Sequence, residues 1–108
     1  MCTGGLTELT ADNFDQTIRN GLPYLVEFYA DWCAPCGRME PVLAELSELY
    51  GDRVRFFRVN ADAQIALSER HNVSTLPCVI VFRDGAERGR ATGARTKAAL
   101  KELIGRVL

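Results

Sequence analysis

Two cysteines separated by two residues form the part of the sequence that is best suited to chemistry. Cys33 and Cys36 lie in the stretch Trp32-Cys33-Ala34-Pro35-Cys36, directly after an apolar run that is typical of a buried strand. At this spacing two thiols lie one helical turn apart and can form a reversible disulfide. The same spacing also supplies half of a tetrahedral zinc site or part of the ligand set of an iron–sulfur cluster. The surrounding residues must decide between these chemistries.

A metal site would need two further ligands. The candidates are Cys2, His71 and Cys78, and they do not form a second closely spaced pair. A metal knuckle is therefore the weaker interpretation, and we expect a redox pair with no bound metal and no cofactor.

Length, composition and charge limit the possible functions. The chain has 108 residues, 47% of them hydrophobic, and a formal net charge of −1. This predicts a single domain over residues 1–108, with a core that needs no disulfide crosslinks, and argues against binding to nucleic acid or anionic lipid. No secretory signal pattern or membrane-length apolar stretch is present in the sequence, so we expect a cytoplasmic protein that does not bind membranes. In a reducing cytosol a C-x-x-C pair is more often catalytic or metal-binding than a permanent crosslink.

Hydrophobic periodicity and turn residues predict about five strands and about four helices, which alternate along the chain before a final strand–strand–helix unit. The strands are expected over Leu6–Leu9, Tyr24–Tyr29, Val54–Asn60, Cys78–Arg83 and Glu87–Thr92. The helices are expected over Ala11–Asn20, Pro35–Tyr50, Ala63–Arg70 and a C-terminal segment that Thr96 caps. This order predicts an α/β fold, in which a mixed sheet has helices on both faces.

Local signals add detail to these elements. Thr10 is the candidate N-cap of the first helix, and Asp84-Gly85 predicts a hairpin turn. Pro41 lies inside the long helix and should kink it, because proline has no N–H to donate to an earlier carbonyl. The last helix is expected to bury an apolar face made of Leu100, Leu103, Ile104, Val107 and Leu108.

Three features together make the chain resemble the thioredoxin family. They are the Trp-Cys-Ala-Pro-Cys motif at a strand-to-helix junction, a long helix interrupted by Pro41, and Thr75-Leu76-Pro77 before a buried strand. The resemblance covers nearly the whole chain. It implies the thioredoxin fold, with a central mixed sheet of about five strands flanked by about four helices, and the reduction of protein disulfides as the activity.

The resemblance gives the two cysteines different roles. Cys33 begins the long helix, where unpaired N–H groups and the positive end of the helix dipole favour the thiolate, so it is expected to be the nucleophile. Cys36 lies one turn further along and is expected to be more covered, which suits the resolving thiol. The two are expected to form the Cys33–Cys36 disulfide during each reaction cycle.

Glu27 is the lone charge in an apolar strand and shares its alternation with Leu25 and Tyr29. Burial without a partner should make its carboxyl easier to protonate than usual. In the family a buried aspartate at this position takes the proton from the resolving cysteine, and the resemblance implies that role for Glu27. Alternatively, the longer side chain of Glu27 bends toward solvent or toward a cation such as Arg58. Arg58 matches a position where the family often has a lysine. Arg58 itself is either a redox-tuning residue or a solvated strand charge.

The resemblance also implies a surface that receives the substrate. In the family the peptide bond before the proline at position 77 is cis, and the backbone at Leu76 pairs with an extended substrate segment. Trp32 and Leu76 would contribute apolar surface around the disulfide. Gly93 matches a family glycine where a side chain would obstruct the approaching partner.

The residues between the cysteines indicate the direction of the reaction. Ala34 stands where the family most often has glycine, while Pro35 is retained, and both help to set how easily the disulfide is reduced. We expect a monomeric reductant whose partners are disulfide-containing client proteins and an NADPH-linked thioredoxin reductase. The alternatives are a disulfide oxidase or isomerase, and a non-catalytic binding module, against which the intact Cys33 and Cys36 count.

Three residues remain outside this scheme. Cys78 follows Pro77, close to the expected disulfide, and is better interpreted as a small buried residue that opens a strand than as a third redox sulfur. Cys2 is better interpreted as an inert or adventitiously cross-linking thiol than as a regulatory one. His71 lies at a helix end, where polar capping is a better interpretation than catalysis.

Overall fold

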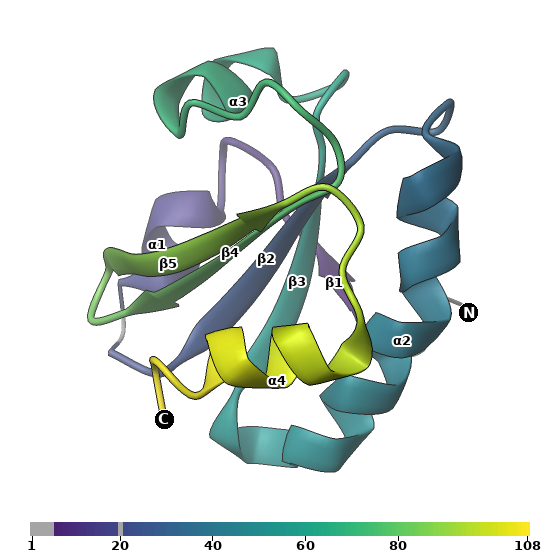
Figure 1. The fold of residues 1–108 in the computed structure, drawn as a ribbon. Helices are drawn as coiled ribbons and strands as arrows, with labels where there is room; N and C mark the ends of the chain where they lie inside the picture. The colour runs from purple at the N-terminus through teal and green to yellow at the C-terminus, as the bar shows by residue number, and fades with distance from the viewer. Residues whose placement is uncertain (1–5, 20) are drawn as a thin grey trace.

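The strands form one mixed sheet in the order β1-β3-β2-β4-β5, as the computed structural model shows for residues 6–19 and 21–108 (Figure 1). Their bounds are β1 Thr7–Glu8, β2 Tyr24–Tyr29, β3 Arg55–Asn60, β4 Cys78–Arg83 and β5 Ala86–Thr92. β3 is parallel to both β1 and β2, whereas β4 is antiparallel to β2 and β5. The predicted mixed sheet is confirmed.

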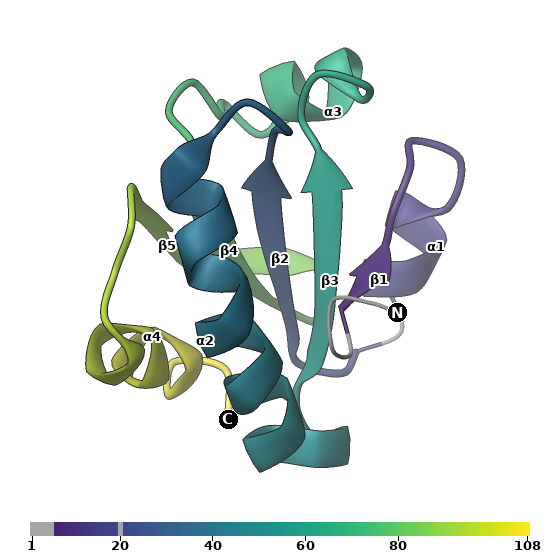
Figure 2. The ribbon, with the colours of Figure 1, turned by 90° about the vertical axis from the view of Figure 1, so that its right-hand side faces the viewer.

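Helices cover both faces of this sheet (Figure 2). Their bounds are α1 Phe14–Ile18, α2 Ala34–Tyr50, α3 Ile65–Arg70 and α4 Lys97–Ile104, with a short 3₁₀ turn at Gly51–Arg53. α2 and α4 pack on one face, and α1 and α3 pack on the other. Among the described residues, no helix is long and apolar enough to cross a membrane.

β2 lies at the centre of the sheet, and all six of its residues are buried. Its side chains alternate between the two cores, so that Leu25 joins the cluster under α2 and α4, while Val26 and Phe28 join the cluster under α1 and α3. This explains why the strand is a nearly continuous apolar run. The same alternation directs Glu27 to the face that α2 covers.

The first helix begins later than predicted. Asn13, not Thr10, is the N-cap of α1, and its Oδ1 accepts a hydrogen bond from the Thr10 amide at 2.8 Å. The amides of Asn13 and Phe14 both donate to the Thr10 carbonyl, so residues 10–13 form a turn before the helix. Threonine and asparagine are both favourable N-cap residues, and the turn over residues 10–13 places the start of the helix at Asn13. The predicted end at Asn20 lies outside the described residues.

The C-terminal half follows the sequence signals more closely. Asp84 and Gly85 both have positive φ, at 56° and 77°, as a tight hairpin turn requires. Thr96 caps α4, with its Oγ1 accepting from the Ala99 amide at 3.2 Å. One prediction is wrong: Leu108 is 58% exposed, because α4 ends at Ile104 and the last residue lies beyond the apolar face.

The two leucines Leu43 and Leu49 of α2 allow a matched test of this packing. Leu43 is fully buried, whereas Leu49 is 53% exposed. We expect Leu43→Ala to lower the free energy of unfolding by about 2–5 kcal/mol, since it removes buried methyl groups and leaves a cavity. Leu49→Ala should change it by less than about 0.5 kcal/mol. Urea unfolding of the two oxidised variants would contradict the packing if their losses were equal.

Candidate active site

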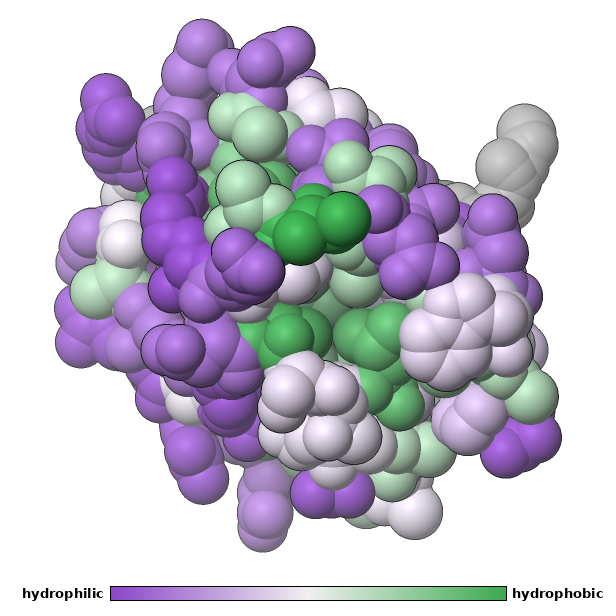
Figure 3. Space-filling view, turned by 90° about the horizontal axis from the view of Figure 1, so that it is seen from above, coloured by the Kyte–Doolittle hydropathy of each residue, from purple (hydrophilic) through white to green (hydrophobic). Residues whose placement is uncertain are grey.

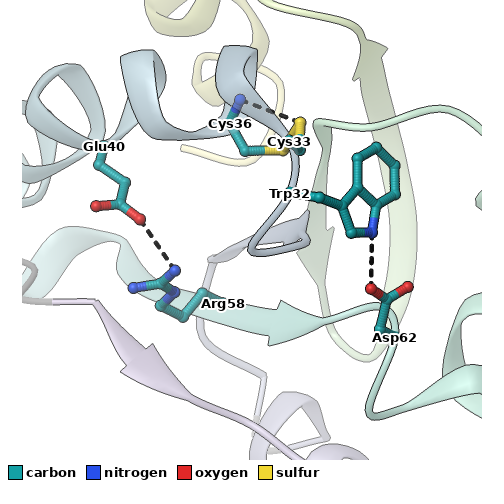
Figure 4. The surroundings of a disulfide bond; sticks show 6 residues. All are labelled: Trp32, Cys33, Cys36, Glu40, Arg58 and Asp62. Atoms are coloured by element: carbon teal, nitrogen blue, oxygen red, sulfur yellow. Dashed lines mark hydrogen bonds and ion pairs between the residues drawn. A yellow bond between two sulfur atoms is a disulfide. The ribbon is translucent and has the colours of Figure 1, made fainter.

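A disulfide joins Cys33 and Cys36 at the beginning of α2 (Figure 4). Cys33 is the N-cap residue, and its Sγ accepts a hydrogen bond from the Cys36 amide at 3.2 Å. Cys33 is 6% exposed and Cys36 is 2% exposed. In the dithiol form, the N-terminal amides of this 17-residue helix would stabilise a thiolate at Cys33. Cys33, the slightly more exposed of the two residues, is therefore also the one whose thiolate the helix favours.

The loop before β4 lies against this disulfide. The Leu76–Pro77 peptide bond is cis, and Leu76 packs against the cluster formed by Tyr29, Ala30, Cys33 and Cys36. The Pro77 carbonyl accepts a hydrogen bond from the Gly93 amide at 2.7 Å, which joins this loop to the segment after β5. The first of these loops thus contacts the redox pair, and the second is joined to it through Pro77.

Gly93 is required by its backbone conformation. Its φ is +87°, a region that side chains disfavour, while a Cβ placed there would meet only Arg95 Nη1, at an ordinary contact distance of 3.6 Å. The fold alone therefore gives a reason for glycine at this position.

Trp32 stands beside the disulfide and is 70% exposed. Its Nε1 donates a hydrogen bond to Asp62 Oδ2 at 2.7 Å (Figure 4). Asp62 was not singled out from the sequence. It follows β3, and because β2 and β3 are parallel neighbours, the loops after them meet at the same edge of the sheet. That topology is the signal that could have found it.

The face at which α2 begins is apolar near its middle. In the view from above, green apolar side chains gather there, bordered by purple charged and polar ones (Figure 3). Two large hydrophobic side chains are exposed near the beginnings of α2 and α3: Trp32, and Ile65 at 61% exposure.

Glu27 is completely buried, in register with Arg58 of β3 and Val79 of β4. Neither of its carboxylate oxygens has a hydrogen-bond partner among the described residues. Burial raises the pKa of this carboxyl to about 7; the Arg58 charge opposes the rise, and the charges of Glu40 and Glu8 add to it. The alternative in which Glu27 bends to solvent is wrong, since its side chain is enclosed.

Arg58 is not a solvated strand charge, because its side chain is only 11% exposed. Its Nη2 lies 3.0 Å from Glu40 Oε2, and its Nε lies 3.6 Å from Glu8 Oε1. Its guanidinium carbon also lies 3.8 Å from the centre of the Tyr29 ring. Arg58 therefore faces the two outer glutamates, and no ion pair joins it to Glu27 in the described part of the chain.

Cys78 and the His71 ring pack with the cluster under α1 and α3. Cys78 is buried in the cluster under α1 and α3, on the other face of the sheet from α2, and burial raises the pKa of its thiol. His71 is the C-cap residue of α3, but its ring packs 5.0 Å from the Phe14 ring and 5.8 Å from the Phe82 ring. Burial accordingly lowers its pKa. Cys2 lies outside the described residues.

A mixed sheet between helices, with a Cys-x-x-Cys disulfide at a helix N-terminus and a cis-proline loop beside it, defines a class of thiol-disulfide exchange proteins. The family model of thioredoxin matches residues 5–106. The chain therefore belongs to the thioredoxin family, a family of protein-disulfide reductases, as its sequence indicated.

Known relatives agree with this assignment. The chain is 40% identical to thioredoxin X, chloroplastic, of Arabidopsis thaliana over 94% of its own length and 57% of that protein. It is 40% identical to a thioredoxin of Chlamydia caviae over 89% of this chain and 92% of the relative. A solved structure of Plasmodium falciparum thioredoxin matches with a TM-score of 0.87 and 30% identity, over 95% of this chain and 100% of that one.

The buried carboxyl of Glu27 should make stability depend on pH. Its pKa is about 7 in the folded chain against an ordinary value of 4.5, so the folded state holds the proton more tightly. The contribution of Glu27 to the free energy of unfolding should therefore be greatest below about pH 4.5 and should fall until about pH 7, by about 3 kcal/mol.

Urea unfolding of the oxidised protein and of Glu27→Gln between pH 4 and 8 measures this loss. We expect the difference in unfolding free energy between the two proteins to move by that amount in favour of the glutamine variant as the pH rises. Curves that stay parallel over this range would mean that Glu27 titrates as an ordinary carboxyl.

Proposed function

We propose that the chain reduces disulfides in client proteins through reversible exchange at Cys33 and Cys36, and that an NADPH-linked thioredoxin reductase restores its dithiol. The observation that carries this proposal is the disulfide at the beginning of α2, with Cys33 at the N-cap position of that helix. We further propose that it acts as a monomer made of one domain, in the cytoplasm, where a reducing poise keeps such a pair available as the dithiol.

The reaction consists of two exchanges. In the first, the Cys33 thiolate attacks one sulfur of the client disulfide, which forms a mixed disulfide and releases the other client sulfur as a thiolate. In the second, the Cys36 thiolate attacks Cys33 Sγ, which closes the Cys33–Cys36 bond and releases the second client thiolate. Two electrons pass to the client, and the chain is left as the disulfide.

Glu27 accepts the proton that Cys36 must lose before the second exchange. Cys36 is almost fully buried, so bulk water has little access to its thiol. A carboxyl with a pKa of about 7 is partly ionised at neutral pH and suits proton transfer there. In the family this position holds an aspartate, and glutamate carries the same carboxyl group on a side chain that is one methylene longer. A water molecule between Cys36 and Glu27 would carry the proton from one to the other.

The client lies across the two loops beside the disulfide. The backbone of Leu76, next to Pro77, pairs with an extended client segment, a short form of strand addition that tolerates many sequences. Trp32 supplies apolar contact, and its hydrogen bond to Asp62 fixes the indole in place. The bare backbone at Gly93 leaves room for the partner.

Ala34, Pro35 and Arg58 tune the redox pair. Ala34 and Pro35 carry no charge that would stabilise the Cys33 thiolate further, which favours a reductant over an oxidase or isomerase. A redox titration against glutathione separates these functions, because a strongly oxidising potential would support the oxidase.

Cysteine variants test the order of the two exchanges. In insulin-disulfide reduction with thioredoxin reductase and NADPH, Cys33→Ser and Cys36→Ser should each abolish turnover. Only Cys36→Ser should accumulate mixed disulfides, because it retains the nucleophile but cannot complete the second exchange. The matched control is Cys78→Ala, a buried cysteine on the other face of the sheet, which should retain activity. Turnover by Cys33→Ser, or stoichiometric zinc in the wild type without trapping by Cys36→Ser, would exclude the mechanism.

Substitution of Glu27 tests the proton acceptor. Glu27→Gln should slow the closure of the Cys33–Cys36 bond at pH 7 by roughly one to two orders of magnitude, because the amide cannot accept the proton. Formation of the mixed disulfide should be much less affected. Stopped-flow measurement of both steps between pH 6 and 8 distinguishes them, and an unchanged closure rate would remove Glu27 from the mechanism.

A further inference from the structure

Arg58, whose charge acts on the buried acid Glu27, makes its ion pairs with other glutamates. Glu27 and Arg58 are paired in register on the parallel strands β2 and β3, so their backbones are direct neighbours in the sheet. A buried carboxylate beside an arginine ordinarily forms an ion pair, because the pair offsets part of the desolvation cost. Here the carboxylate oxygens of Glu27 have no hydrogen-bond partner within residues 6–19 and 21–108, and the guanidinium points toward Glu40 (Figure 4).

Side chains from one helix and two strands contact the Arg58 guanidinium and fix its position. Glu40 of α2 contacts Nη2 at 3.0 Å, Glu8 of β1 lies 3.6 Å from Nε, and the Tyr29 ring of β2 lies under the guanidinium. Glu8 is itself fixed, since the Tyr29 hydroxyl donates to both of its carboxylate oxygens at 2.9 and 3.0 Å. The two outer glutamates are 39% and 47% exposed, so they remain hydrated while they attract the buried cation.

We propose that Glu40, supported by Glu8, is a positioning residue for the proton-transfer step, because it holds the Arg58 guanidinium away from Glu27 and leaves that carboxyl free to exchange a proton. Without this contact, Arg58 would turn to its neighbour in the sheet and fix Glu27 as a permanent carboxylate. The consequence for catalysis rests on the proposed function of Glu27, but the direction of Arg58 can be measured separately.

The charges that act on Glu27 from the surrounding elements are few. They are Arg58 on β3, Glu40 on α2 and Glu8 on β1, whereas its neighbour on β4 is the apolar Val79. The thiols of the redox pair would add to these in the reduced protein. The disulfide form therefore gives the simplest titration, since Cys33 and Cys36 then do not ionise.

The experiment is a carboxyl ¹³C NMR titration of Glu27 in the oxidised protein. Glu40→Gln should lower the midpoint by about one pH unit or more, the size of effect that an adjacent arginine has on a carboxyl. Glu48→Gln is the matched control: it removes the same charge from an exposed position of the same helix, and Glu48 has no described ion pair with Arg58. An unchanged midpoint in Glu40→Gln would overturn the proposal.

A second measurement separates positioning from a simple charge effect. The Arg58 Nε–H resonance should be insensitive to the ionisation of Glu27 in the wild type and should follow it in Glu40→Gln. Glu40→Gln should also be introduced into Arg58→Met. In that background it should change the Glu27 midpoint much less than it does in the wild type, because no guanidinium is present to turn toward Glu27. A Glu27 shift of full size without Arg58, or an Arg58 resonance that never follows Glu27, would mean that Glu40 acts through its own charge only.

The pH profile of disulfide closure links this proposal to catalysis. In Glu40→Gln the profile should move to lower pH together with the Glu27 titration. If the titration moves and the profile does not, Glu40 positions Arg58 but Glu27 is not the proton acceptor. If neither moves, the positioning role is wrong, whatever Glu27 does.

Discussion

The burial of one carboxyl group in the central strand is the constraint on which the redox site depends. Glu27 is enclosed between its neighbours Arg58 and Val79, on the face of the sheet that α2 covers, and an ion at this place is strongly disfavoured because water cannot solvate it. The same packing that makes β2 a stable strand therefore holds the proton on Glu27 until about pH 7. A group that gains and loses a proton near neutrality is what a buried thiol such as Cys36 needs.

The other parts of the site supply what this carboxyl cannot. The beginning of α2 favours the anion on Cys33, so in the proposed mechanism the helix assists the first exchange and Glu27 of β2 assists the second. Leu76 packs against the two cysteines, and the next residue, Pro77, accepts a hydrogen bond from the Gly93 amide. The charge of Arg58 lowers the pKa of Glu27, and the charges of Glu40 and Glu8 raise it.

Much of this could be predicted from the sequence where one local pattern determines the outcome. The apolar run of β2 and the bounds Cys78–Arg83 of β4 followed directly from composition and turn residues. The start of α1 did not, because Thr10 and Asn13 offer similar capping chemistry and only the observed turn favours Asn13. In the site, the position and burial of Glu27 could be inferred from its strand, and the position of the cysteines from their spacing. Asp62 could have been found only by combining the predicted strands β2 and β3 into a parallel pair, which brings the loops after them together. The contact between Glu40 and Arg58 could not be predicted, because it joins a helix and a strand through tertiary structure alone.

The proposed mechanism requires that Glu27 is buried and exchanges its proton near neutral pH. A ¹³C NMR titration of its side-chain carboxyl in the oxidised wild-type protein measures this directly, with the Cys33–Cys36 disulfide intact so that no thiol interferes. We expect a midpoint of about 7. A midpoint near the ordinary value of 4.5 would contradict it, since the carboxyl would then be a permanent anion at neutral pH with no proton to exchange.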